Sequence, residues 1–362
     1  MAKYHELVDK LAQRIRHGDY RLKGFPSHID LVSEFGVNSR TMTKALQELV
    51  HAGLLVRTKA GRVVLAEGGE KTGLFIGLLV PVYPSPFMLM WHWLIDRLTR
   101  KRGWILKQLP YLHWQDPIIP DALAGLDGAF FLPQGGDIPG DILDLLAESP
   151  KPTVILEQDI PDFDMPCLRS LNPASVERML NHVQSAGFDR IDCLSTQPED
   201  EMIRERIRWW EFWRAGHGRD GTLINEPVAV TESALDRAYK VVKKRLSKDG
   251  ESFDALFCTT SAAALGAMRA FHEAGRSVGT DVGVCAAEDW VGMAEYLIPS
   301  LTCIHDPELE PYVSVFLDWF AQGGEWKGPR LVQPSEGPLF VGESTGGNRQ
   351  RLGDKHRRRQ AE

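Results

Sequence analysis

Long apolar segments are missing from this sequence of 362 residues. No run approaches the roughly 20 apolar residues that a membrane-spanning helix needs, so no membrane-embedded part is expected. Residues 1–18 are charged and amphipathic, and they lack the uninterrupted apolar core of a signal peptide. These two absences predict a cytoplasmic protein that does not associate with a membrane.

Cysteine is scarce, with five residues in the chain and no C-x-x-C pair among them. Cys193, Cys258, Cys285 and Cys303 lie in or at the end of short apolar runs that are typical of buried strands. Cys167 lies in a loop-like stretch. This spacing predicts small core side chains in a reducing compartment rather than a disulfide framework or a zinc site.

Catalytic signatures are also absent. The sequence contains no G-x-S-x-G, H-E-x-x-H, P-loop or G-x-G-x-x-G motif. The pair His305-Asp306 follows the last expected core strand, where the chain would cross between two lobes, and a hinge is its ordinary interpretation. We therefore expect a protein that is not an enzyme and that uses no metal and no cofactor.

Charge, by contrast, is distributed very unevenly along the chain. The net charge is −7, but residues 1–66 carry +5, residues 344–362 carry +4 and the 277 residues between them carry −16. The length also exceeds the about 250–300 residues at which a single core stops growing, so several domains are expected. A basic head on an acidic body is typical of a DNA-binding module joined to a sensor.

Apolar side chains recur at helical spacing in three places within residues 1–66. Ser27 and Asn38 stand where N-caps are needed, and Gly36 can supply a left-handed turn between the second helix and the third. A short helix, a glycine-containing turn and a further helix form the helix-turn-helix pattern. We predict helices over 4–15, 27–35 and 39–51, followed over 53–65 by two strand-like runs around a basic turn.

A series of short motifs runs through the same residues: Pro26-Ser27, Phe35-Gly36-Val37, Asn38-Ser39-Arg40-Thr41, Ala45-Leu46, Gly53-Leu54 and Gly61-Arg62. In this order they resemble the winged helix-turn-helix of GntR-type regulators. The resemblance implies a third helix that reads operator DNA in the major groove and a wing that contacts the backbone or the minor groove. The predicted DNA-binding residues are Ser39, Arg40, Thr41, Thr43 and Lys44 on the helix, and Lys59, Gly61 and Arg62 on the wing.

One position departs from the family pattern. Where GntR-type proteins usually have Glu-Arg after Pro-Ser, this chain has His28-Ile29, so one arginine contact is missing and the DNA sequence that is read should differ. The alternative interpretation of residues 1–66 is a winged helix that contacts another protein, with Arg40 and Lys44 merely solvated.

Apolar runs alternate with amphipathic helices in residues 74–343, after a polar, glycine-rich linker at 67–73. The run 74–80 is almost continuously apolar, as a strand covered on both faces requires. The alternation predicts the α/β class, with doubly wound parallel sheets in two lobes around a cleft, and ligands beyond the carboxyl ends of the strands. Predicted strands are 74–80, 105–109, 129–132, 153–156, 190–195, one near Val228, 255–258 and 282–285; predicted helices are 86–102, 174–186, 199–215, 232–247 and 261–275.

A second set of motifs lies at 253–258, 264–270, 279–284, 288–289, 298–304 and 341–346. These residues are similar to the effector domain of LacI/GalR-type regulators, which is related to periplasmic sugar-binding proteins. A GntR-type reader on a LacI-type sensor is the arrangement of the arabinose-repressor subfamily. The resemblance implies a homodimer on operator DNA and a small-molecule effector, a sugar or a sugar derivative.

Candidate ligand contacts follow from strand ends and from aromatic side chains. The predicted ligand-binding residues are Ser85, Trp91, Arg206, Ser261, Glu288 and Trp290, and Trp209 is a further candidate. The resemblance puts Arg206 where relatives keep an arginine that holds a sugar hydroxyl or a carboxylate. A tryptophan on a helix can equally belong to the core, and Arg206 can equally belong to a solvated face.

The prediction as a whole is a DNA-binding transcription regulator, a repressor, whose operator affinity an effector controls. The chain has Thr260-Ser261 where the family has Asn-Asp, and Ala287-Glu288 where the family has a Tyr or Phe before an Asp. These departures keep an effector-blind repressor with a degenerate pocket as an alternative. The other alternative is a small-molecule sensor whose head docks a protein. Residues 344–362 show no apolar periodicity and are expected to form a basic, disordered tail.

Overall fold

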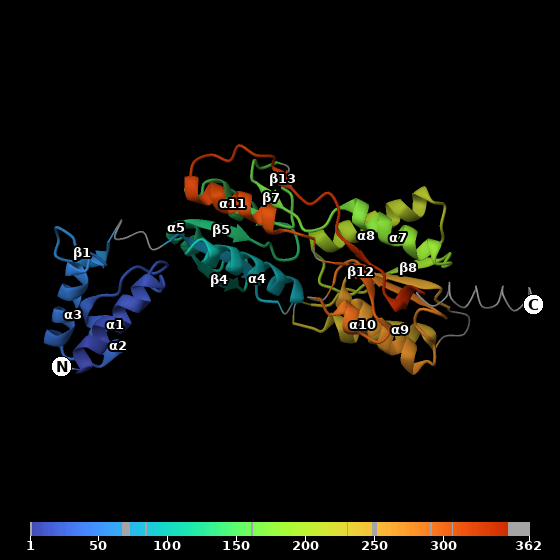
Figure 1. Cartoon of the computed structure of the whole chain (residues 1–362), viewed down its shortest axis with the longest axis horizontal. Coiled ribbons are helices and arrows are strands. Elements are labelled where there is room, and N and C mark those ends of the chain that lie inside the picture. The colour runs from blue at the N-terminus through green and yellow to red at the C-terminus, as the bar shows by residue number, and fades with distance from the viewer. Residues whose placement is uncertain are drawn as a thin grey trace, which may run out of the picture.

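A small helical head and two α/β lobes follow one another along the long axis of the chain (Figure 1). The computed structural model describes residues 2–66, 73–83, 85–160, 162–229, 231–247, 252–289, 292–305 and 307–346. Within these ranges no helix is both long enough and apolar enough to cross a lipid bilayer. Most of the predicted linker and the chain beyond Gly346 lie outside the described residues.

Local sequence signals set the ends of the helices in the head. The Ser27 hydroxyl accepts a hydrogen bond from the Asp30 N–H at 3.2 Å, and the Asn38 side chain accepts one from the Thr41 N–H at 2.8 Å, so both predicted N-caps are confirmed. Gly36 ends the second helix at a φ of 59°, which a glycine adopts without strain. The elements are α1 (Ala2–Arg16), α2 (His28–Phe35), α3 (Ser39–His51) and the antiparallel pair β1 (Leu55–Arg57) and β2 (Val63–Leu65).

The first lobe is a six-stranded sheet with helices on both faces. Its strand order is β13-β7-β6-β5-β3-β4, and the described pairs are all parallel. Buried apolar side chains pack α4 and α11 against one face, and α5 and α6 against the other. The elements are β3 (Phe75–Pro81), α4 (Pro86–Lys101), β4 (Ile105–Tyr111), α5 (Ile118–Gly125), β5 (Gly128–Phe131), α6 (Gly140–Ala147), β6 (Thr153–Leu156), β7 (Cys167–Leu168), α11 (Glu310–Gln322) and β13 (Leu331–Val332).

The second lobe repeats this layout. Its strand order is β14-β12-β11-β10-β8-β9, and β14 pairs antiparallel with β12 while the other described pairs are parallel. One face packs against α9 and α10, and the other against α7 and α8. The elements are α7 (Pro173–Ser185), β8 (Ile191–Ser195), α8 (Glu201–Gly216), β9 (Leu223–Asn225), α9 (Ala234–Leu246), β10 (Ala255–Cys258), α10 (Ser261–Glu273), β11 (Gly283–Ala286), the 3-10 turn η1 (Ala294–Tyr296), β12 (Thr302–Ile304), β14 (Leu339–Phe340) and η2 (Glu343–Thr345).

Several predicted boundaries need correction. The strand expected near Val228 is β9, which ends at Asn225; Val228 lies in the following loop, where its N–H donates to the Thr196 carbonyl at 3.2 Å. Cys167 lies in the short strand β7 and not in a loop, and all five cysteines are buried and none forms a disulfide bond. The α/β fold extends past 343, since Ser344 and Thr345 are buried in η2 and do not belong to a tail.

Ser344 ties the C-terminal end of the described chain to the second sheet. Its hydroxyl donates to the Val284 carbonyl at 2.6 Å and accepts from the Thr302 N–H at 2.8 Å. Ser344→Ala leaves two buried backbone groups unsatisfied, so we expect it to lower the free energy of unfolding by about 1–3 kcal/mol. Chemical denaturation measures this, with the exposed Ser247→Ala as control; equal stability of the two variants would contradict the assignment of Ser344 to the folded lobe.

Candidate functional site

The third helix and the hairpin turn present the predicted DNA-binding side chains on the surface of the head. Ser39, Arg40 and Lys44 are exposed on α3, and Lys59, Gly61 and Arg62 are exposed between β1 and β2. Thr41 is half-buried at the start of α3. The cationic groups of both elements are therefore free to meet phosphates or base edges.

Thr43 differs from this set because its hydroxyl is engaged within the head. It donates to the Ser39 carbonyl at 2.9 Å, and it lies 3.1 Å from Nε2 of His28, the first residue of α2. The Thr43 hydroxyl thus joins α2 to α3. The residue pair His28-Ile29, which departs from the family pattern, supplies one side of that bond.

The turn between β1 and β2 is held by backbone bonds around Thr58. Its carbonyl accepts from the Gly61 N–H at 2.9 Å, and its hydroxyl accepts from the Arg62 N–H at 3.1 Å. Gly61 adopts a φ of 80°, so a side chain there would be strained. This tight turn leaves Lys59 and Arg62 pointing away from the core of the head.

The loop between α1 and α2 fastens the head to the first lobe, which sequence reasoning did not predict. The Arg21 guanidinium lies 4.4 Å from the centre of the Phe75 ring and 3.7 Å from Asp127, and Lys107 pairs with Asp19 at 3.2 Å. Asp127 also accepts from the Phe75 N–H at 3.0 Å, so one carboxylate serves both the loop and the start of β3. The head is therefore docked on the lobe by charge and ring contacts.

A cavity of about 730 Å³ lies between the two lobes. Its walls follow the carboxyl ends of β3, β5, β6, β8 and β11 and the N-termini of α8, α9 and α10, which is where ligands bind in parallel sheets. Of the predicted ligand residues, Ser85, Ser261 and Glu288 line it. The cavity is large enough for a sugar-sized molecule.

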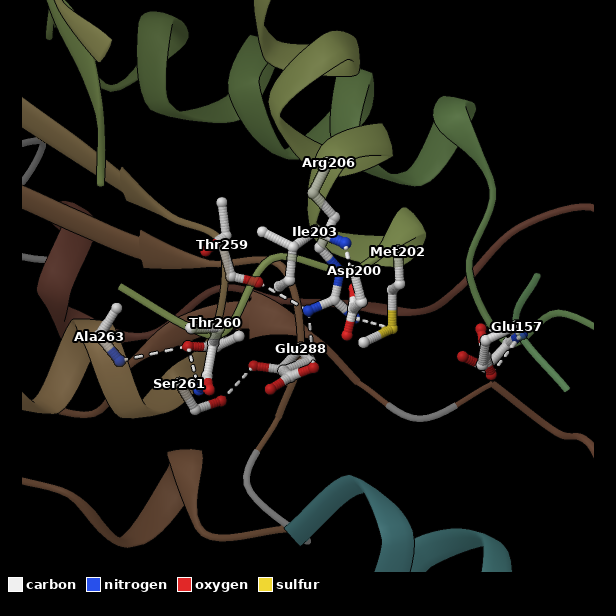
Figure 2. A network of polar contacts seen from close by, with 12 residues as sticks. Glu157, Asp200, Met202, Ile203, Arg206, Thr259, Thr260, Ser261, Ala263 and Glu288 are labelled. Carbon is white, nitrogen blue, oxygen red and sulfur yellow. Dashed lines mark hydrogen bonds and ion pairs between the residues drawn. The ribbon is translucent and has the colours of Figure 1, made fainter. Parts of the chain in front are cut away.

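Arg206 is buried and does not line the cavity, in contrast to the prediction of a direct ligand contact or a solvated face. Its side chain is 1% exposed, and its guanidinium donates to the Thr259 carbonyl at 2.6 Å and pairs with Glu288 at 2.7 Å (Figure 2). The Ser261 hydroxyl donates to the Glu288 carbonyl at 2.6 Å. Arg206 therefore fixes the position of Glu288 at the wall.

The predicted aromatic contacts are not at the cavity. Trp91 is 0% exposed within the core of the first lobe, and Trp209 packs against the core of the second, so the prediction for Trp91 is wrong. Trp290 lies outside the described residues. The rings that do line the cavity are Tyr83 and Phe87, which follow the end of β3.

Four carboxyl groups that line the cavity were missed, those of Glu157, Asp200, Glu201 and Glu232. Glu157 follows β6 at a φ of 67°, is 6% exposed, and accepts from the Ser170 N–H at 3.2 Å; burial raises its pKa to about 7. Asp200 caps α8 by accepting from the Ile203 N–H at 2.8 Å, and burial raises its pKa as well. A cap signal was available at Asp200, and Glu157 directly follows the predicted strand 153–156, so its place at a strand end was a signal that could have found it.

Polar contacts bridge the lobes beside the cavity. The Tyr83 hydroxyl from the first lobe donates to the side-chain carbonyl of Gln197 in the second, and the Gln197 amide donates to the Thr260 hydroxyl at 3.1 Å. Burial raises the pKa of Tyr83 to about 12. Arg169 and Glu205 form a further pair at 3.0 Å across the crossover between the lobes.

Among the described residues, Asp289, Cys303 and His305 bring possible metal-ligand atoms within 4.8 Å of one another, although no metal was predicted. The Asp289 carboxylate accepts from the Ala294 N–H at 3.0 Å and lies 3.6 Å from Nε2 of His305. Asp306, the second residue of the predicted hinge pair, lies outside the described residues.

The buried Glu157 makes the stability of the protein depend on pH. Its pKa is about 7 in the folded chain against an ordinary value of 4.5, so the folded state holds an extra proton between these values and stability is lost as the pH rises through them. Glu157→Gln removes this loss. From about pH 5 to about pH 8 we expect the free energy of unfolding of the wild type to fall by roughly 3 kcal/mol more than that of the variant.

Denaturant titrations at these pH values measure the difference. Glu226→Gln, which changes an exposed carboxylate on the second lobe, serves as the control for loss of a carboxylate at the surface and should follow the wild type. If the free energy of unfolding changes with pH in the same way for the wild type and Glu157→Gln, the Glu157 carboxyl group is solvated.

Residues 180–308 match the family of periplasmic binding protein-like domains. The chain is also similar to the HTH-type transcriptional repressor PurR of Photobacterium profundum, with 28% identity over 217 residues, which are 58% of this chain and 60% of that protein. It is 27% identical to the HTH-type transcriptional regulator GalR of Lacticaseibacillus casei over 161 residues, 43% of this chain and 47% of the relative. The chain thus spans roughly half the length of these relatives.

Solved structures share the two-lobed arrangement. A LacI family regulator from Enterococcus faecium with bound ribose superposes with a TM-score of 0.62 at 19% identity, covering 75% of this chain and 98% of its own. A LacI family regulator from Arthrobacter sp. in complex with lactose superposes with a TM-score of 0.62 at 16% identity, covering 75% of this chain and 99% of its own. The α/β part of this chain therefore has the two-lobed periplasmic-binding-protein-like fold and is similar to LacI-family transcription regulators.

Proposed function

We propose that this chain is a DNA-binding transcription regulator, a repressor, in which a small molecule bound between the lobes controls operator affinity. The observation that carries the proposal is the pairing of an exposed cationic helix and hairpin with a lobe that forms one wall of a ligand-sized cavity. The similarity to proteins named as transcriptional regulators supports it. The charges of +5 on residues 1–66 and −16 on residues 67–343 agree with a DNA-binding head on a sensor.

In this proposal residues 1–66 are a winged helix-turn-helix of the GntR type. Arg40 and Lys44, together with Ser39 and Thr41, enter the major groove, where arginine can bind guanine through two hydrogen bonds. Lys59 and Arg62 contact phosphates beside the groove. Two such heads in a homodimer would bind the two halves of a pseudo-palindromic operator, about one helical turn apart or more.

The effector in this proposal is a sugar or a related small molecule. Similar structures are described with bound ribose and with lactose, and the cavity of about 730 Å³ suits molecules of this size. Such a cavity favours a regulated protein over an effector-blind repressor. A repressor without an effector would show no stabilising ligand in a thermal-shift screen, since a ligand that binds only the folded state raises the melting temperature.

Coupling between ligand and DNA would pass through the docked loop of the head. The loop residue Arg21 contacts Phe75 at the first residue of β3, and the other end of β3 lies at the cavity. Lobe closure that moves β3 would therefore move the head. Couplings of this kind are typically about 1–3 kcal/mol.

Arg40→Ala tests the DNA-binding face. Loss of an arginine that reads a base should cost about 1–3 kcal/mol and remove discrete sites, as measured by genomic footprinting with the purified protein at two salt concentrations. Arg16→Ala removes an exposed arginine from α1 and should keep the sites. No enriched sites for the wild type at low salt, or binding that is insensitive to salt, would favour a head that docks a protein.

Arg21→Ala tests the docking of the head. Because Arg21 faces the first lobe, we expect operator affinity to fall about fivefold through loss of a positioned head, roughly the value of a cation–π contact. The dependence of affinity on salt should stay that of the wild type, since no phosphate contact is lost. A smaller dependence of affinity on salt would instead assign Arg21 to the DNA interface. An unchanged affinity would show that the docked loop does not couple the cavity to DNA binding.

A further inference from the structure

The acidic and basic side chains that line the cavity all carry negative charge when ionised. Five carboxyl groups line the cavity, and no lysine, arginine or histidine does so among the described residues. The five are Glu157 from the first lobe and Asp200, Glu201, Glu232 and Glu288 from the second. An anionic ligand in this cavity would find no cation to bind among the described residues that line it.

Cations behind the wall neutralise part of this charge. Glu288 pairs with the buried Arg206 at 2.7 Å, and Glu201 pairs with Arg204 at 2.9 Å and with Arg208. Glu232 is exposed to solvent. These three groups therefore do not require a charged ligand.

Glu157 and Asp200 are different, because neither forms an ion pair within 4.0 Å with a described residue; Arg206 lies near both carboxyl groups, but burial outweighs its effect on their pKa values. The Glu157 carboxyl is 6% exposed, faces the cavity, and receives its hydrogen bonds from Ser170, which is neutral. Asp200 uses one oxygen to cap α8 and lies beside Glu288 (Figure 2). Burial without an ion-pair partner disfavours the ionised form of such a carboxyl group, and a cation bound in the cavity would stabilise that form.

The rest of the wall limits the ligand further. Apolar side chains such as Phe87, Leu132 and Leu156 cover part of the cavity, so the ligand needs a carbon skeleton of some size. The rings of Tyr83 and Phe87 can also face a cation. Ser85 stands at the N-cap of α4 without making a capping bond, which leaves its hydroxyl for a polar group of the ligand.

We infer that the ligand of this cavity carries a positively charged nitrogen, as an amino sugar, an amino alcohol or a similar small amine does, and that it binds between Glu157 and the carboxylates of the second lobe. The inference rests on the proposed function for its role as effector. It excludes sugar phosphates and sugar acids. Neutral sugars that occupy the cavity would lack the ion pair with these carboxylates, which is its strongest interaction.

Thermal-shift and calorimetric titrations of the full chain with matched compounds test this inference. The panel is glucosamine with its neutral N-acetyl form and glucose 6-phosphate, choline with its neutral isostere 3,3-dimethylbutan-1-ol, and agmatine. We expect a cationic member to raise the melting temperature and its neutral partner to bind roughly tenfold or more weakly, the equivalent of losing one charge-assisted contact. Glucose 6-phosphate should give no shift.

Glu157→Gln should lower the affinity for the cationic compound by about tenfold or more. Asp200→Asn keeps a side chain that can cap α8, and it should also lower the affinity for the cationic compound. The exposed Glu226→Gln should bind as the wild type does. Equal binding by neutral or anionic members, no shift with any cationic member, or equal affinity of Glu157→Gln and Glu226→Gln would each overturn the inference.

Footprinting of the ligand-free protein separates this result from the proposed function. Operator binding without any response to amines would overturn the ligand class alone. Amine binding without operator sites would support the ligand class and overturn the regulator.

Discussion

The ion pair between Arg206 and Glu288 organises the second lobe at the cleft. Arg206 comes from α8 on one face of the sheet, and Glu288 follows β11, while the Thr259 carbonyl at the end of β10 accepts a second bond. Ser261, the first residue of α10, attaches this helix to the same group because its hydroxyl donates to the Glu288 carbonyl. Removing the Glu288 carboxylate would leave the buried Arg206 guanidinium without its ion-pair partner, which is strongly destabilising. One buried guanidinium thus holds two strand ends and two helices in the geometry that shapes the cavity wall.

The head could be predicted almost residue by residue because its signals are local. Caps at Ser27 and Asn38, the left-handed turn at Gly36 and the apolar spacing of the helices each act within a few residues. The alternation of the α/β part likewise yielded the two lobes and most of their elements. Two-residue strands such as β7, β13 and β14 exist only through pairing with distant segments, so no local pattern could reveal them.

The cavity could be predicted only in part for the same reason. Ser85, Ser261 and Glu288 follow strand ends, and the topology of parallel sheets brings such positions to the cleft. Whether Arg206 faces a ligand or a buried carboxylate depends on Glu288, which is far away in the sequence. Glu157 and Asp200 come from different lobes and meet one cavity only when both lobes are folded.

The contact between Gly18 and Phe75 limits how freely this head can be exchanged. Gly18 adopts a φ of 72°, and an added Cβ would lie 2.2 Å from the Phe75 ring, so no other residue fits there unless that buried ring shifts. Chimeras that join a foreign head after residue 66 would break this fit even if both parts folded. Shape matching at one glycine ties residues 1–66 to the first lobe, so an exchanged head would have to carry the matching surface of that lobe with it.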